Sequence, residues 1–250
     1  MRKLILALLF VACLSIQASA FGPMMLLSGT SGEVDLCDSM GASGTYLHWW
    51  NGEYSGDLDK ACQSSGASTA EGTATAGVIV VGGKINGVYG ALLDADDERI
   101  TWSCPSNTID EAGTLEFGLT LTADPTSDSE LAAIKTDVEN WIYITYDDLG
   151  AGNDGRIRLS YKGNNNADVT YSDTITDGAT VTVSVTWKTS ATEALCVDVG
   201  NGYDCLGSAD LDAFAGTTDT IYVGDSDVGY GSNDLFKIDD FQIREGYEGP

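Results

Sequence analysis

Short apolar patterns typical of β-strands recur along this 250-residue chain, and clusters of Gly, Asn and Asp separate them. Almost no segment shows the 3.6-residue periodicity of an amphipathic helix. Many short strands divided by turn residues favour an all-β fold, namely a two-sheet antiparallel β-sandwich. The predicted strands cover residues 76–82, 98–103, 114–122, 141–146, 156–162, 168–173, 180–187, 194–199, 203–207, 220–224 and 235–244. One segment is ambiguous, because Ser127–Glu130 resembles a helix start although the LAAIK that follows fits a strand equally well.

The first twenty residues have a basic start, an apolar run and an Ala-Ser-Ala end. This pattern predicts a secretory signal peptide that is cleaved after Ala20. A lipoprotein signal ending at Cys13 is the alternative interpretation. No later stretch has the ~20 unbroken apolar residues of a membrane helix. We therefore expect an exported protein, extracellular or at the cell surface, with the periplasm as a further alternative. It has a loose lead-in at 21–32 and a single domain over 33–250.

The charge balance is strongly acidic, with 12 Lys and Arg against 38 Asp and Glu, a net charge of −26. Removing the signal peptide takes away Arg2 and Lys3, which leaves 10 basic residues against 38 and a net charge of −28. Nucleic acid is excluded as a partner, because its phosphates must be neutralised by cationic side chains. An acidic surface suits solubility, high ionic strength or divalent cations.

Five cysteines remain after signal cleavage, so at least one has no partner within the chain. A two-residue turn at Gly200-Asn201 would place Cys196 opposite Cys205, at a position where a disulfide can close. Cys37–Cys62 is the second predicted pair, which leaves Cys104 free. The spacing leaves the other pairings of these three cysteines open.

The order of several segments resembles laminin-G-like domains of the concanavalin A-like class. These segments are GTLEFGLTLTADP, VTVSVTW, ALCVDVGNG, IYVGDS and FKIDDFQI, and the resemblance covers roughly residues 45–245. It implies a jelly-roll sandwich in which YLHWWNGE returns beside the last strand. The sequence departs from the family at Gly118, where such domains often carry Trp.

The last predicted strand contains two aspartates, Asp239 and Asp240, among apolar residues. Strict alternation puts Asp239 on the same face as Phe241 and Ile243, so we expect it to be buried and Asp240 to be exposed. A buried carboxylate must be paired, hydrogen-bonded or metal-bound. The resemblance implies that Asp239 can bind a structural calcium, with Glu53 as the second predicted ligand. Hydrogen bonds to backbone amides, without an ion, are the alternative.

Other acidic residues give weaker indications of an ion site or an active site. Asp225, in a loop with Asp227 and Asp234, could help to wrap an ion, although a solvated loop is the simpler interpretation. Residues 33–38 (EVDLCD) resemble the catalytic strand of laminarinase-type glycosidases, whose carboxylates act as nucleophile and acid. The motif lies directly after the signal peptide rather than on a central strand, so glycoside hydrolysis is the minority hypothesis. The single histidine, His48, fits a core or rim position.

The aromatic residues suggest the function. Trp102, Trp141 and Trp187 lie on strand patterns and are predicted to be core residues. Trp49 and Trp50 are adjacent, so they face opposite ways in a strand, and the outer one could stack on a sugar ring. We therefore expect a non-catalytic secreted module that binds carbohydrate, a cell-surface glycan or an extracellular protein. The alternative is a structural or adhesive subunit that associates with itself.

Overall fold

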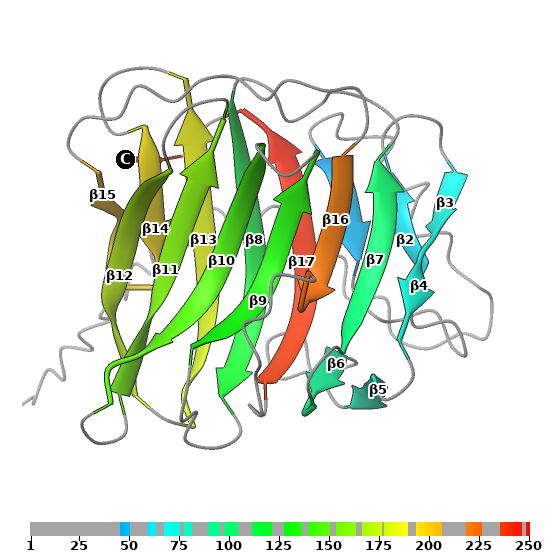
Figure 1. Cartoon of the computed structure of the whole chain (residues 1–250), viewed down its shortest axis with the longest axis horizontal. Helices are drawn as coiled ribbons and strands as arrows, with labels where there is room; N and C mark the ends of the chain where they lie inside the picture. The colour runs from blue at the N-terminus through cyan, green and yellow to red at the C-terminus, as the bar shows by residue number, and fades with distance from the viewer. Residues whose placement is uncertain are drawn as a thin grey trace, which may run out of the picture. The chain divides into compact units, whose positions relative to one another are not determined.

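Every regular element that the structure describes is a β-strand (Figure 1). The structure is a computed structural model, and all the residues that it describes belong to one compact unit, Asp35–Pro250. The described residues are 46–50, 60–63, 68–75, 78–81, 90–95, 98–104, 112–121, 128–136, 140–150, 154–163, 167–176, 178–189, 194–206, 219–226, 236–246 and 249–250. Within them, no helix is long and apolar enough to cross a membrane.

The strands form two antiparallel sheets that lie one behind the other (Figure 1). One sheet follows the order β15 (Asp204–Cys205), β14 (Leu195–Asp198), β13 (Thr180–Lys188), β8 (Ala112–Leu121), β17 (Phe236–Glu245), β1 (Tyr46–Trp50), β2 (Lys60–Gln63) and β3 (Ser68–Glu71). In the same sheet, β6 (Gly90–Leu93) also pairs with β17, and β5 (Ile79–Val81) pairs with β6. The other sheet follows the order β12 (Asp168–Thr176), β11 (Asp154–Lys162), β10 (Trp141–Asp148), β9 (Ser129–Lys135), β16 (Asp219–Gly224), β7 (Arg99–Cys104) and β4 (Thr73–Ala74).

This arrangement confirms the predicted two-sheet β-sandwich. All the predicted strands are present, and β1 pairs with the last strand, β17, as expected. The ambiguous segment after Ser127 is the strand β9, buried at nearly every position. The short strands β2, β3, β4 and β6 were not predicted. They contain two to four residues each, too few to show a periodic pattern.

The core lies between the two sheets and is built from alternate residues of each strand. In β8, Leu115, Phe117 and Leu119 are at most 1% exposed. From the facing sheet, Ile142 and Ile144 of β10 join the same cluster of buried residues. Such alternation, with one face inside and one outside, is expected of antiparallel sheets that pack as a sandwich.

The two aspartates of β17 lie at a β-bulge. Asp239 pairs with Gly118 of β8, and Gln242 pairs with Glu116, so β17 has one extra residue. Asp240 takes the positive φ of 50° that such a bulge requires. The bulge reverses the alternation, because the core residues before it are Phe236 and Ile238 and those after it are Phe241 and Ile243.

This bulge corrects the prediction made for Asp239. The residue is buried, at 6% exposure, but it follows Ile238 directly and so lies on the opposite face from the core. Glycines lie on both sides of it, Gly118 on β8 and Gly90 on β6. A Cβ added at Gly90 would lie 3.1 Å from the Cβ of Asp239. Asp240 is half-buried rather than exposed.

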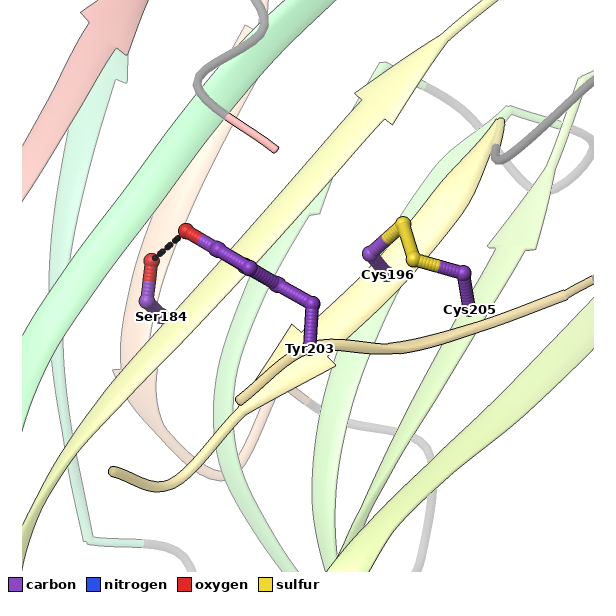
Figure 2. The surroundings of a disulfide bond; sticks show 4 residues. All are labelled: Ser184, Cys196, Tyr203 and Cys205. Atoms are coloured by element: carbon purple, nitrogen blue, oxygen red, sulfur yellow. Dashed lines mark hydrogen bonds between the residues drawn. A yellow bond between two sulfur atoms is a disulfide. The ribbon is translucent and has the colours of Figure 1, made fainter. Parts of the chain in front are cut away.

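The predicted Cys196–Cys205 disulfide is present (Figure 2). The two cysteines are register partners with Cα atoms 4.1 Å apart. The predicted tight turn is wrong, since the ladder ends at Val197 and Asp204. The Asp198 carboxylate closes the wider loop, because its Oδ1 accepts hydrogen bonds from three consecutive backbone amides, those of residues 200–202, at 2.7–3.0 Å. Of the second predicted pair, Cys37–Cys62, Cys37 and the Cys62 side chain lie outside the described residues.

Replacing both Cys196 and Cys205 with serine is expected to lower the free energy of unfolding by about 2–3 kcal/mol, because a short closed loop no longer restricts the unfolded chain. Urea denaturation under non-reducing conditions measures the change. An unchanged unfolding midpoint, or peptide mapping that finds either cysteine joined elsewhere, would contradict the assigned pairing.

Candidate functional site

The outward face of the seven-stranded sheet carries a pair of aromatic side chains. On β10, Ile142, Ile144 and Tyr146 point into the core, so Trp141 and Tyr143 lie on the opposite face. The ring centroids of Trp141 and Tyr143 are 4.3 Å apart, with the ring planes tilted by 38°. Trp141 is only half-buried. The prediction that Trp141 is a core residue is therefore wrong.

Hydroxyl groups and small side chains surround this pair in the sheet register. Tyr143 lies opposite Ser160 on β11 and Ala133 on β9, and Ala133 lies opposite Tyr222 on β16. Thr145 occupies the next outward position along β10. Aromatic rings beside hydroxyl groups are the groups that recognise a sugar, whose C–H faces pack on rings while its hydroxyls exchange hydrogen bonds.

A buried carboxyl group, Glu130, lies at the edge of the same face. A register irregularity between β9 and β10 places Glu130 opposite Thr145. Glu130 is 3% exposed, and among the described residues neither of its carboxyl oxygens has a partner in hydrogen-bond geometry. Burial raises the pKa of Glu130 to about 8. The neighbouring Asp225 adds to the rise, while Ser226 and Lys135 act in the opposite direction. The group is therefore mainly protonated at neutral pH.

The sequence did not indicate Glu130 as a functional residue. Its only sequence signal was the helix-like pattern that starts at Ser127, and this pattern belongs to a strand. Asp225, interpreted from sequence as a solvated loop residue, is 8% exposed and directly follows β16. A single sequence cannot show that these two acids lie close together, because they are 95 positions apart.

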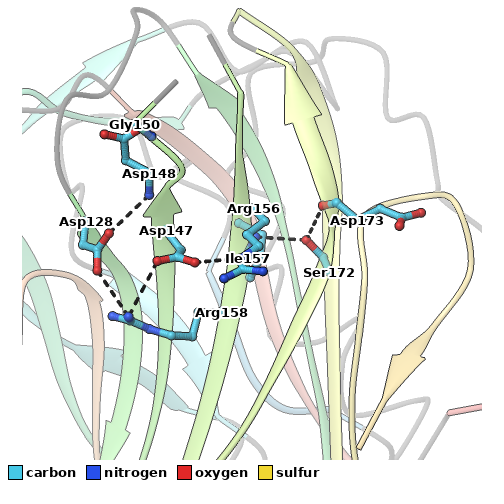
Figure 3. A network of polar contacts seen from close by, with 9 residues as sticks. All are labelled: Asp128, Asp147, Asp148, Gly150, Arg156, Ile157, Arg158, Ser172 and Asp173. Atoms are coloured by element: carbon cyan, nitrogen blue, oxygen red, sulfur yellow. Dashed lines mark hydrogen bonds and ion pairs between the residues drawn. The ribbon is translucent and has the colours of Figure 1, made fainter. Parts of the chain in front are cut away.

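Charged side chains cross-link one end of the sheet (Figure 3). Arg156 Nε donates to Asp147 Oδ2 at 2.7 Å, and its guanidinium lies 3.8 Å from the centre of the Tyr171 ring. Arg158 Nη1 contacts Asp128 Oδ2 at 3.2 Å and Asp147 Oδ1 at 3.8 Å. The charges of both arginines are thus compensated by acids beside them.

Trp50, one of the two tryptophans predicted to bind ligand, is a core residue. It is 1% exposed and packs on Trp102, with ring centroids 6.0 Å apart, so it cannot serve as an exposed binding surface. The same face of β1 holds His48, which is fully buried as expected. Burial lowers the pKa of His48 to about 3. Trp49 pairs with Gln242, but its side chain is not among the described ones.

The remaining predicted site residues give no assembled centre. Asp239 lies at the β17 bulge in the other sheet, whereas its predicted companion Glu53 and the EVDLCD motif at 33–38 lie outside the described residues. In the part of the chain that the structure describes, no three His, Cys, Asp or Glu side chains are grouped so that they could hold a metal ion.

No protein-family model matches the chain, and no curated protein matches it either. Solved structures do match. The binding domain of botulinum neurotoxin serotype D is similar over 82% of this chain, with a TM-score of 0.57 and 12% identity, and the match covers 49% of that structure. A structure of botulinum neurotoxin type C, whose cell entry depends on interaction with two ganglioside molecules, is similar over 84% of this chain and 50% of its own, with a TM-score of 0.56 and 11% identity.

A third similar structure is the binding domain of botulinum neurotoxin DC in complex with rat synaptotagmin II. It has a TM-score of 0.55 and 13% identity, and the match covers 82% of this chain and 48% of that one. The chain thus spans about half the length of the structures that it matches. At this level of identity, the similarity shows the β-sandwich fold and no more.

Proposed function

We propose that this chain is a secreted, non-catalytic module that binds carbohydrate on the outward face of the seven-stranded sheet. The observation that carries the proposal is the half-buried Trp141, which is stacked beside Tyr143 on that face. The strands β9, β10 and β11 hold this aromatic pair rigidly, so little conformational entropy is lost when a sugar ring packs on it. Thr145 and Ser160 lie along the same rows but are only 1% and 8% exposed, so the half-buried Trp141 is the group that a ligand would contact.

The structural neighbours are consistent with this proposal at a coarse level. They include domains that bind gangliosides and a domain that binds a synaptotagmin, so glycan and protein are both represented among their ligands. A shared fold does not establish a shared ligand, because function depends on the residues of the site. The argument therefore rests on the aromatic pair of this chain.

Hydrolysis of a glycosidic bond is the second candidate, and one observation favours it. A carboxyl group with a raised pKa near a second carboxyl group is the arrangement that glycosidases use, and Glu130 and Asp225 are such a pair. However, Glu130 is 3% exposed, which leaves its oxygens little access to a sugar. We expect no release of reducing ends from polysaccharides. Release that disappears in Glu130→Gln would establish the hydrolase instead.

A structural calcium ion remains a proposal. Asp239 would supply one buried carboxylate. Calcium needs six to eight oxygen ligands, so backbone carbonyls and water would have to complete the set, with Glu53 as the second predicted acid. The ion would stabilise the β17 bulge in the ten-stranded sheet, away from the aromatic pair.

A glycan array tests the proposed function directly. The wild-type protein, labelled and applied with calcium and separately with a chelator, is expected to give saturable binding to a restricted set of glycans. Loss of binding with the chelator would support the calcium site, and equal binding would contradict a role for calcium. No binding under either condition, together with concentration-dependent oligomers in sedimentation, would favour the self-assembling subunit.

A further inference from the structure

Accessible polar side chains lie on the outward face of the seven-stranded sheet beyond β9, on the side away from β11. Tyr222 of β16 lies opposite Thr101 of β7, and Thr101 lies opposite Thr73 of β4. Tyr222 stands between the core residues Ile221 and Val223, so its side chain and those of its register partners point outward. Tyr222 and Thr101 are half-buried and Thr73 is exposed. A ligand can therefore reach all three side chains.

These three positions continue the row that begins at Tyr143. Tyr143 lies opposite Ala133 of β9, and Ala133 lies opposite Tyr222, so one register row runs over β10, β9, β16, β7 and β4 (Figure 1). Neighbouring strands are about 4.8 Å apart, so the row is roughly 19 Å long from Tyr143 to Thr73. None of its five residues carries a charge. Thr220, two residues before Tyr222 on the same face, is also half-buried.

Tyr222 is a second aromatic residue on which a sugar ring can pack. It lies two strands and two residue positions away from Trp141, which puts the two Cα atoms roughly 12 Å apart. A sugar packed on the indole therefore leaves the Tyr222 ring to another sugar of the same chain. Two separated aromatic rings with hydroxyl side chains beyond them suit an oligosaccharide better than a single terminal sugar.

The charge of the protein selects among oligosaccharides. Acidic residues outnumber basic ones by 38 to 12, so a polyanionic glycan that extends over the surface would be repelled. The row offers hydroxyl groups and aromatic rings, which match the hydroxyls and C–H faces of a neutral sugar. We infer that the ligand is a neutral, linear oligosaccharide that crosses the strands from β10 to β4, with one sugar on Trp141 and a further sugar on Tyr222. The inference rests on the proposed glycan-binding function.

A chain-length series tests the inference. The probes are linear β-1,4-linked oligomers of glucose, N-acetylglucosamine, xylose and mannose, from the disaccharide to the hexasaccharide, titrated into the full chain by calorimetry. In the series that binds, wild-type protein is expected to bind the hexasaccharide at least about tenfold more tightly than the disaccharide. A gain of this size corresponds to one additional well-packed aromatic contact.

Variants locate the second contact. Tyr222→Ala is expected to abolish most of the gain with chain length, while its affinity for the disaccharide, which packs on Trp141, stays as in wild type. A general disturbance of the sheet would instead weaken both saccharides alike. Thr101→Val keeps the shape of the side chain without its hydroxyl, and it should lower the hexasaccharide affinity about threefold.

Two matched controls should bind both saccharides as wild type does. Tyr171→Ala removes an exposed tyrosine of β12, at the other side of the same sheet. Thr182→Val changes a half-buried threonine of β13 in the other sheet. Circular dichroism confirms the folding of each variant, and the Thr101→Val result decides if Tyr222→Ala does not fold.

The outcomes separate the two proposals. Equal affinity for disaccharide and hexasaccharide, with binding still lost in Trp141→Ala, would overturn the inference and leave the proposed function intact. A gain with chain length that survives both Tyr222→Ala and Thr101→Val would also overturn the inference. So would tighter binding of hexagalacturonic acid than of every neutral hexasaccharide. Binding to none of these saccharides would overturn the proposed function together with the inference.

Discussion

The Gly113→Ala variant is expected to be less stable than wild type by about 3 kcal/mol, the upper range for overpacking a buried site. Gly113 on β8 lies opposite Trp187 on β13, and the indole ring covers the glycine backbone. An added Cβ would lie 2.1 Å from Trp187 Cζ2, far closer than two carbon atoms can approach. Trp187 is completely buried, so the ring cannot move aside without disturbing the core.

Urea denaturation of two further variants tests this explanation. Gly178→Ala is the matched control, because Gly178 has a positive φ of 72° but no atom within 4 Å of the added Cβ. That control should lose only about 1 kcal/mol, from backbone strain. Trp187→Phe, combined with Gly113→Ala, should restore part of the lost stability. Two results would contradict the packing of the Trp187 ring on Gly113. One is an equal loss of stability in both alanine variants, and the other is that Trp187→Phe restores no stability to Gly113→Ala.

The Glu130→Gln variant is expected to remove a large pH dependence of stability. The pKa of Glu130 is about 8 in the folded protein and about 4.5 when the side chain is solvated. Between these values the unfolded chain releases a proton that the folded protein retains. The contribution of Glu130 to stability should therefore be highest below pH 4.5, fall as the pH rises and level off above pH 8. The total loss should be on the order of 4 kcal/mol.

Denaturation midpoints of wild type and Glu130→Gln, measured from about pH 5 to pH 9, give the comparison. His48, with a pKa of about 3, contributes the opposite slope below pH 6.5, because its unfolded form binds a proton that the folded form excludes. This contribution cancels in the difference between the two proteins. Glu245→Gln, at an exposed position of β17, should keep the wild-type slope. Parallel pH profiles for wild type and Glu130→Gln would mean that Glu130 is ionised in the folded protein.

The sequence allowed the strands and one hairpin to be predicted, because both depend on local pattern. Alternation and turn residues located β8, β10 and β13 to within about two residues. The pairing of Cys196 with Cys205 followed from counting outward from one turn. The pairing is confirmed although the turn is wider than expected. The wider turn takes the same number of residues from each strand, so the register of the two cysteines is unchanged.

The predictions that failed depend on tertiary neighbours. Asp239 was assigned to a face by strict alternation, but the positive φ at Asp240 inserts a bulge that reverses the order after it. Trp141 was assigned to the core because it lies on a strand pattern, but β10 has aromatic residues on both faces. Which face is buried depends on the opposite sheet, and Tyr146 rather than Trp141 packs there, against Phe236. Nothing in a single sequence distinguishes these two aromatic positions.

The central claim, that a glycan binds on Trp141, is tested most directly by titrating the strongest glycan from the array into three proteins. Trp141→Ala is expected to lose binding at least about 30-fold, the loss typical of a central tryptophan at a binding site. Tyr203→Ala is the control, because Tyr203 lies in the β14–β15 loop beside the other sheet, where its hydroxyl contacts Ser184 Oγ at 3.0 Å. It should bind the glycan as wild type does. Undiminished binding by Trp141→Ala, with its folding confirmed by circular dichroism, would contradict the account.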